Sequence, residues 1–233
     1  MSLIASVSSK YSKPDPNKPL LADGFDEPLL RGLYDRLMPQ EQPAIKNEAW
    51  IRPNPRLQWI VEQVIPKALM LDIGCGNAEF LLHMVYYEHC FAGIGIDISG
   101  EMVEVARQGA SALLLEKRVA FFRSAIEHWD KSGYGLISMN DTLEHLFSPV
   151  AAIKKCATIM DADGYFVGLI PHAKSCNGNN DRHLHHFEPE ELGVLMSAFF
   201  KDVHIKLFEY DAPDDIVEGK IGWVCRDARD TDN

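Results

Sequence analysis

From Ala68 onward, short apolar runs alternate with segments of helical periodicity, and no other feature of the sequence constrains the fold as strongly. Five runs have the length of buried strands: ALMLDI, FAGIGIDI, VAFFRS, GLISMN and YFVGLI. Three helical segments fall between them: AEFLLHMVYYE, GEMVEVARQGA and the stretch from about residue 149 to 160. Strands that alternate with helices in this way build βαβ units, which predict a parallel sheet.

The last third of the chain departs from this alternation. A helical segment at about residues 189–199 is followed by two strand-like runs, VHIKLFEY and IGWVCR, with no helix between them. Because parallel neighbours need a long crossover, these two runs are expected to pair as an antiparallel ribbon. We therefore expect a Rossmann-like α/β fold whose seven-stranded sheet is mostly parallel and carries an antiparallel ribbon at one edge.

Two helices are expected before the first strand. In EPLLRGLYDRLM, at about residues 27–38, apolar side chains recur at helical spacing, and Pro39 and Pro43 end the pattern. A second helix at about residues 55–64 ends before Pro66. Residues 1 to about 24 have little to bury, so we expect a loose arm there. The predicted organisation is an N-terminal arm with lid helices over residues 1–50 and one α/β domain over residues 51–233.

The composition disfavours several classes of partner. Lysine and arginine (23) against aspartate and glutamate (34) give a net charge of -11, which repels phosphate backbones and disfavours nucleic acid. The five cysteines contain no Cys-x-x-Cys pair, so we expect neither a disulfide framework nor a zinc knuckle, and a cytoplasmic location. The N-terminus lacks the order of a signal peptide, and no apolar stretch reaches the roughly 18 residues of a membrane span.

The first predicted strand ends in a glycine loop, LDIGCGNAEF. Asp72, Gly74 and Gly76 lie at the carboxyl end of this strand, where open α/β sheets bind ligands. Gly74 permits a tight turn with positive φ, and Gly76 has no Cβ to hold a ligand away from the backbone. Asp97 ends the second strand, where a carboxylate can accept hydrogen bonds from both hydroxyls of a ribose.

The same loop discriminates between cofactors. A glycine pair alone is also typical of turns in unrelated α/β proteins. A dinucleotide fold usually has a third glycine or alanine where this chain has Glu79, whose carboxylate would repel a pyrophosphate at the helix start. NAD is therefore disfavoured. Asp72 suits instead a cofactor that carries an ammonium and a sulfonium and has no phosphate.

The loop LDIGCGNA resembles the first motif of class I S-adenosylmethionine-dependent methyltransferases, with Ala78 in place of a frequent third glycine. Four further segments agree in order and spacing, over about residues 52–205. The resemblance is nearest to the ubiquinone-biosynthesis O-methyltransferases and related small-molecule enzymes, and it implies S-adenosyl-L-methionine as the cofactor. The tail after Phe200 matches nothing in the quinone enzymes, so their substrate is not inherited.

The resemblance also implies which residues contact the cofactor. Asp97, Ile98 and Met102 match the motif at the ribose and adenine edge, and Ser124 and Ala125 match the position that meets the adenine amino group. Asn140 would lie under the methionine moiety, and Arg56, in NPRLQWI, would hold the cofactor carboxylate. The complete expected set is Arg56, Asp72, Gly74, Gly76, Asp97, Ile98, Met102, Ser124, Ala125 and Asn140.

Two histidines are candidate catalytic bases. Methyl transfer to a hydroxyl requires removal of its proton, and neutral imidazole is suited to this task near pH 7. His145, in DTLEH, and His172, in IPH, both follow the carboxyl ends of predicted strands. The competing interpretation is structural, with His145 packing its helix and His172 shaping the pocket rim.

A metal-assisted alternative stays open. Asp141, Glu144 and His145 have the i, i+3, i+4 spacing of one helical face, which could hold Mg²⁺. Similar clusters occur in the quinone enzymes and in small-RNA terminal 2′-O-methyltransferases, and His185, in RHLHHFE, matches a further histidine of the latter. Because LEH also occurs in metal-free methyltransferases and Asp141 is shorter than the usual glutamate, no metal is assigned.

The sequence thus predicts an S-adenosylmethionine-dependent methyltransferase that methylates an oxygen of a small-molecule acceptor. The helices before Leu69 would fold over the cofactor as a lid. One alternative is a Mg²⁺-dependent RNA 2′-O-methyltransferase, and another is a catalytically silent protein that binds the cofactor without turnover.

Overall fold

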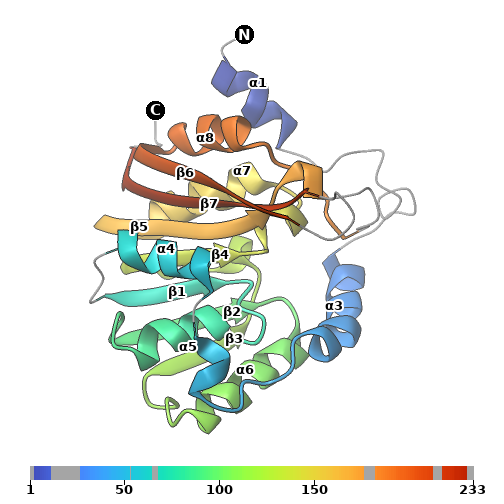
Figure 1. Ribbon diagram of the computed structural model, residues 1–233, viewed down its shortest axis with the longest axis vertical. Coiled ribbons are helices and arrows are strands. Elements are labelled where there is room, and N and C mark those ends of the chain that lie inside the picture. Colours follow the sequence, from blue (N-terminus) through green and yellow to red (C-terminus); the bar gives the residue numbers. More distant parts are fainter. Residues whose placement is uncertain are drawn as a thin grey trace.

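A seven-stranded sheet forms the centre of the computed structural model, which describes residues 3–11, 27–52, 54–64, 68–175, 182–211 and 217–229 (Figure 1). Five strands are parallel: β1 (Leu69–Ile73), β2 (Ala92–Asp97), β3 (Val119–Arg123), β4 (Tyr134–Asn140) and β5 (Met160–Pro171). The hairpin of β6 (Phe200–Asp211) and β7 (Val217–Ala228) completes the sheet. The strand order β3-β2-β1-β4-β5-β7-β6 confirms the predicted mostly parallel sheet with an antiparallel ribbon at one edge.

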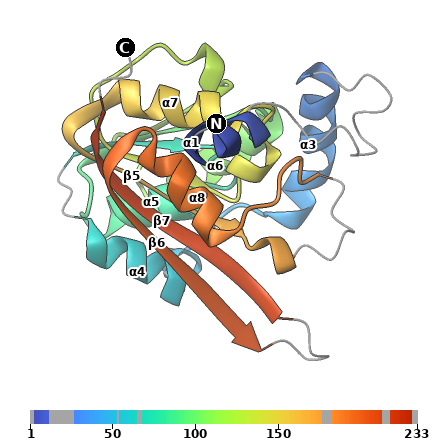
Figure 2. The same ribbon diagram turned by 90° about the horizontal axis from the view of Figure 1, so that it is seen from above.

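The last strand, β7, joins the ribbon to the parallel strands. It runs antiparallel to both β5 and β6, so that Val167 of β5 and His204 of β6 both pair with Val224. The β7 side chains Ile221, Trp223 and Cys225 are fully buried, whereas β6 forms the exposed edge. Figure 2 shows this hairpin extending beyond the rest of the sheet.

Helices cover both faces of the sheet, and the core therefore lies in two layers (Figure 2). On one face, α4 (Pro55–Gln63), α5 (Glu79–Tyr86) and α6 (Gly100–Ala112) pack apolar side chains against the strands. On the other face, α7 (Pro149–Ile159) and α8 (Pro189–Ser197) do so, and α1 (Leu3–Lys10) packs against α8. None of the helices in the described part of the chain is both long and apolar enough to cross a membrane.

Side-chain caps set where two of the helices near the sheet's carboxyl edge begin. The Asn54 side chain accepts hydrogen bonds from the backbone N–H groups of Arg56 and Leu57 and starts α4. Ser99 accepts one from the Met102 N–H and starts α6. α6 thus begins directly after the carboxyl end of β2.

The expectation of a loose arm is wrong for residues 3–11, which form α1 and its C-terminal turn. The reason is burial that sequence spacing does not reveal. Tyr11 is 1% exposed, and its ring stacks on Phe187 with centroids 4.4 Å apart. Its hydroxyl donates to Glu191 Oε2 at 2.7 Å and contacts the His186 carbonyl oxygen at 3.0 Å. The rest of the expected arm, residues 1–2 and 12–24, lies outside the described residues.

The expected stop at Pro39 is also wrong, because α3 runs from Glu27 to Glu41 and includes this proline. A proline removes one backbone donor and is most disruptive in the middle of a helix. Pro39 lies in the last turn, where the Gln42 N–H still closes the helix on the Met38 carbonyl oxygen at 2.7 Å. α3 consequently reaches far enough to bring Gln42 to the glycine loop, and it packs against α6 at the side of the molecule (Figure 1).

Candidate functional site

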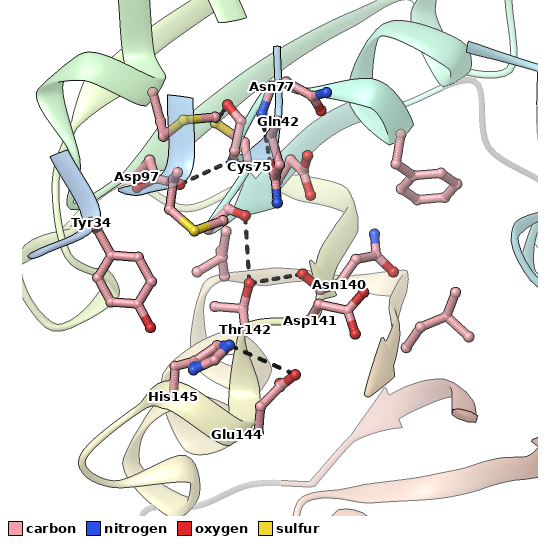
Figure 3. A pocket seen from close by; sticks show the side chains of 18 of the residues that line it. Tyr34, Gln42, Cys75, Asn77, Asp97, Asn140, Asp141, Thr142, Glu144 and His145 are labelled. Carbon is pink, nitrogen blue, oxygen red and sulfur yellow. Dashed lines mark hydrogen bonds and ion pairs between the residues drawn. The ribbon is translucent and has the colours of Figure 1, made fainter. Parts of the chain in front are cut away.

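A cavity of about 680 Å³ opens at the carboxyl ends of β1, β2 and β4, within the roughly 300–1,000 Å³ typical of small-molecule sites (Figure 3). Each residue expected to contact a cofactor lines this cavity: Arg56, Asp72, Gly74, Gly76, Asp97, Ile98, Met102, Ser124, Ala125 and Asn140. Residues from five strand ends and from α3 and α4 thus face a single space. His145 lines it as well.

The glycine loop is held open by backbone conformation and by Asp97. Gly74 and Gly76 have φ of 65° and 53°, in the region that favours glycine, and a Cβ on Gly74 would collide with the Thr142 side chain. Asp97 Oδ2 accepts a hydrogen bond from the Gly76 N–H at 3.0 Å, and Oδ1 accepts one from the Ser99 N–H at 2.9 Å. Asp97 therefore ties the first loop to the start of α6 while facing the cavity.

Asp72 is the most deeply placed carboxyl group of the loop. It is 3% exposed, and the Ser138 hydroxyl of β4 donates a short hydrogen bond to its Oδ1. Burial, opposed by this hydrogen bond and reinforced by the charge of Asp97, raises the pKa of Asp72 to about 7. Asp72 can therefore gain or lose a proton near neutral pH as the charge in the cavity changes.

Helix α3 closes one side of the cavity. Its Asp35 accepts hydrogen bonds from the Ser99 hydroxyl at 2.6 Å and the Glu101 N–H at 3.3 Å. At its C-terminal end, Gln42 Oε1 accepts a hydrogen bond from the Asn77 N–H at 3.3 Å and occupies the space that a Cβ on Gly76 would take. The helix is thus attached both to the glycine loop and to the start of α6.

A buried polar cluster forms the opposite end of the cavity, on the 3₁₀ turn η3 (Leu143–His145) that follows β4. His145 Nδ1 lies 2.8 Å from the Arg182 carbonyl oxygen, which can only accept, so Nδ1 carries the proton and Nε2 keeps a lone pair in the neutral ring. Burial lowers the pKa of His145 to about 4, which keeps the ring neutral at pH 7. Glu144 is 2% exposed, and its Oε1 lies 3.9 Å from His145 Nε2.

His172 does not join this cluster. It is 2% exposed and does not line the cavity, although it follows β5 as expected. Its Nε2 lies 3.0 Å from Glu188 Oε2, and its backbone N–H donates to the Gly219 carbonyl oxygen at 2.9 Å. These contacts place His172 between β7 and the segment before α8. They favour the structural interpretation of this histidine.

The possible metal ligands in the structure differ from the set that the sequence suggested. Glu144, His145 and His183 bring one ligand atom each within 4.8 Å of the others. Asp141 forms an ion pair with Lys220 of β7 instead, and the His185 ring packs near Tyr11 and Phe187 at centroid distances of 5.8 and 6.2 Å. The donor set is therefore two imidazoles and one carboxylate, with His183 in the position expected for His185.

Sequence reasoning missed several residues that line the cavity, among them Tyr34, Gln42 and Lys220. Tyr34 belongs to α3, Gln42 directly follows this helix, and Lys220 comes from β7. Tyr34 fits the apolar spacing of its helix, so its sequence position indicated packing rather than a site. Lys220 directly precedes the apolar run of the last strand, and only the pairing of β7 with β5 places it beside Asp141.

Comparison with known proteins finds similar sequences among methyltransferases. A family model described as a methyltransferase domain matches residues 66–198. A ubiquinone biosynthesis O-methyltransferase of Coxiella burnetii is 30% identical over 124 residues, which cover 52% of this chain and 52% of that protein. A release factor glutamine methyltransferase of Caulobacter vibrioides is 35% identical over 80 residues, or 32% of this chain and 28% of that protein. This chain spans about half the length, or less, of the curated relatives it matches.

Solved structures share the fold at low sequence identity. The [4+2]-cyclase SpnF has a TM-score of 0.65 at 13% identity, covering 85% of this chain and 95% of SpnF. An S-adenosylmethionine-dependent methyltransferase of Thermotoga maritima has a TM-score of 0.59 at 16% identity, covering 84% of this chain and 99% of that one. At such identities the likeness concerns the fold alone. It extends over most of this chain and over nearly all of each of the two solved structures.

Proposed function

Because this chain belongs to the methyltransferase domain family, as a class I S-adenosylmethionine-dependent methyltransferase, we propose that it transfers a methyl group to a hydroxyl oxygen of a small molecule. One observation carries the proposal. A single cavity joins the expected cofactor residues to a buried imidazole, His145, whose Nε2 keeps its lone pair. The O-methyltransferases among the relatives support an oxygen acceptor.

The cofactor would occupy the end of the cavity beside the glycine loop. Asp97 would accept hydrogen bonds from the ribose hydroxyls, and Asp72 would face the ammonium group. Other residues that line the cavity would contact the remaining parts of the cofactor: Ile98, Met102, Ser124 and Ala125 the adenine, Asn140 the methionine moiety and Arg56 the carboxylate. S-adenosylmethionine supplies an electrophilic methyl group on a sulfonium, so the protein need not activate the leaving group.

The chain's own contribution at the other end is proton removal and positioning. His145 Nε2 would accept the proton of the acceptor hydroxyl while the oxygen attacks the methyl carbon, leaving a methyl ether and S-adenosylhomocysteine. The contact of His145 Nδ1 with the Arg182 carbonyl oxygen holds the ring in the tautomer this role requires. His172, the second base candidate, has no support from its position outside the cavity.

The division into an N-terminal arm with lid helices (residues 1–50) and a methyltransferase domain (51–233) belongs to the same proposal. The residues of this N-terminal part that line the cavity support a lid, and they are Tyr34, Met38, Glu41, Gln42 and Pro43. The net charge of -11 argues against RNA as the acceptor.

The Glu144, His145 and His183 cluster favours a second candidate, a metal-assisted transfer to the same hydroxyl. Two imidazoles and one carboxylate are the ligands of zinc, iron or manganese rather than of Mg²⁺, which prefers oxygen. These three residues would hold the ion. Methylation that is lost on chelation and restored by Mn²⁺ or Zn²⁺ would favour this variant over the metal-free one.

The test begins with calorimetric titration of the protein with S-adenosylhomocysteine, beside NAD. Methylation of a panel of phenols and catechols by S-adenosylmethionine follows, with and without EDTA. We expect S-adenosylhomocysteine to bind, NAD not to bind, and at least one hydroxyl compound to be methylated. Binding without turnover on any acceptor would favour the catalytically silent alternative.

A pair of variants separates the base from the fold. His145→Ala should reduce methylation strongly, by the roughly 10²–10⁴-fold typical of a lost base, and should leave affinity for S-adenosylhomocysteine unchanged. His204→Ala, which removes an exposed histidine of β6 that pairs with Asp202, is the matched control and should change neither. Full activity in His145→Ala would contradict its proposed role.

A further inference from the structure

The hydroxyl of Tyr34 is a buried polar group with no hydrogen-bond partner among the residues that the structure describes. Tyr34 belongs to α3, and its side chain lines the cavity. Buried hydroxyls are nearly always hydrogen-bonded in folded proteins, because leaving one unpaired is unfavourable. An unpaired hydroxyl in the wall of a ligand cavity therefore indicates a partner that the ligand brings.

The Tyr34 side chain points toward the polar cluster on η3 (Figure 3). Its ring stands edge-on to the His145 ring, with centroids 5.9 Å apart and planes at 80°. Both carboxyl oxygens of Glu144 are also buried without a hydrogen-bond partner in the described part of the chain. Three polar groups from two different elements thus converge on one region of the cavity, beyond the glycine loop that would hold the cofactor.

The neighbouring residue fixes Tyr34 in place. Asp35 accepts hydrogen bonds from Ser99 and from the Glu101 N–H, and it also faces Arg123 at 3.5 Å. These contacts attach α3 to the start of α6, directly after Asp97. Groups held in this way make good binding residues, because little conformational freedom is lost when the ligand arrives.

We propose that Tyr34 binds the methyl acceptor, donating a hydrogen bond from its phenol to the acceptor oxygen that His145 deprotonates. The assignment rests on the proposed function. It extends that function to a residue of α3, a helix outside the residues 66–198 that the family model matches. A donor at this place stabilises the negative charge that develops on the oxygen as its proton leaves. A tyrosine phenol is protonated at neutral pH and is therefore able to donate.

The test compares Tyr34→Phe with Tyr11→Phe. Each change removes one buried phenol hydroxyl and nothing else, but the Tyr11 hydroxyl is paired with Glu191 and His186, outside the cavity. The probe is 4-nitrocatechol, whose visible spectrum reports ionisation of its hydroxyls. Its binding to the protein loaded with S-adenosylhomocysteine is measured by absorbance, and its methylation by S-adenosylmethionine is measured as kcat and KM.

Tyr34→Phe should weaken 4-nitrocatechol binding and reduce kcat/KM by about tenfold, the effect of one lost hydrogen bond, with affinity for S-adenosylhomocysteine unchanged. Its Tm should not fall, because the folded protein loses no hydrogen bond. Tyr11→Phe should behave oppositely, with a lower Tm and unchanged 4-nitrocatechol binding.

Two results would overturn the role of Tyr34. One is a Tyr34→Phe variant that binds and methylates 4-nitrocatechol as well as the wild type does. The other is a Tyr34→Phe variant with both a weaker affinity for S-adenosylhomocysteine and a lower Tm. This result would assign Tyr34 to the structure of the lid. A wild-type protein that binds S-adenosylhomocysteine but neither binds nor methylates 4-nitrocatechol or other phenols would instead contradict the proposed function.

Discussion

Replacing Asp72 by asparagine should abolish a release of protons that accompanies cofactor binding. Burial raises the pKa of Asp72 to about 7, so about half of the free protein carries a neutral Asp72 at pH 7. The cofactor brings an ammonium group to the end of the cavity that Asp72 lines. A positive charge beside a carboxyl group favours its ionised form, and binding should therefore expel the proton.

The size of the release follows from Coulomb's law. A cation at roughly 4 Å, with the effective dielectric constant of about 20 that suits protein sites, stabilises the carboxylate by about 4 kcal/mol. At 1.36 kcal/mol per unit, this lowers the pKa of Asp72 by about 3 units, to about 4 in the complex. The expected release is then about 0.9 proton per site at pH 6, about 0.5 at pH 7 and about 0.1 at pH 8.

The assay is calorimetric titration with S-adenosylhomocysteine in buffers of different ionisation enthalpy. At each pH, the slope of the observed enthalpy against the buffer enthalpy gives the number of protons exchanged. The slope should follow the predicted fall from pH 6 to pH 8 in the wild type, and should be near zero in Asp72→Asn. Asp163→Asn, which neutralises an exposed carboxylate of β5, is the control and should retain the wild-type slopes. A wild-type slope of zero at pH 6, or an unchanged slope in Asp72→Asn, would refute the reasoning.

The same shift predicts how the stability of the free protein depends on pH. The pKa of Asp72 is raised on folding, from about 3.8 to about 7, so the folded state binds more protons than the unfolded state between these pH values. Stability should therefore decrease as pH rises through this window, by at most about 4 kcal/mol from this group. In Asp72→Asn this contribution should be absent, so the free energy of unfolding should fall less between pH 5 and pH 8 than in the wild type. Urea unfolding at the two pH values measures this difference.

Two further substitutions test the loop and the core. Asp97→Ala should weaken S-adenosylhomocysteine binding by about 1–3 kcal/mol in calorimetry, because it removes the expected ribose acceptor and a contact to Gly76; unchanged affinity would contradict the assignment. Gly168→Ala should destabilise the protein by about 1–3 kcal/mol or more in urea unfolding, because its Cβ would overlap the Trp223 ring. Gly32→Ala, in α3 with open space around it, is the control and should raise stability by about 0.5–1 kcal/mol.

The parallel part of the sheet could be predicted because its signal is local. Each strand from β1 to β5 is a short apolar run, and a buried parallel sheet requires little else. The position of β7 between β5 and β6 was not predicted, although the sequence contains a relevant pattern. IGWVCR is almost continuously apolar, which is typical of a strand buried on both faces, whereas VHIKLFEY alternates as edge strands do.

The two ends of the site also differ in how well the sequence predicts their residues. Asp72 and Asp97 could be placed from the sequence because they end strands, and the carboxyl ends of parallel strands meet at one edge of the sheet. The same argument failed to separate His145 from His172, since both follow strands. What distinguishes them is the hairpin of β6 and β7, which covers His172 through Gly219 and leaves His145 facing the cavity.

Acceptor recognition depends on parts of the chain that the cofactor motifs do not constrain. A cyclase and several methyltransferases share this fold, so the common scaffold leaves the reaction partner open. Tyr34 and Lys220 reach the cavity from α3 and β7, both outside the matched residues 66–198. Because Tyr34 contacts the His145 ring and Lys220 pairs with Asp141, changes in either element can alter the acceptor while the glycine loop stays the same. We therefore expect that substitutions at Tyr34 and Lys220 shift acceptor preference without shifting affinity for S-adenosylhomocysteine.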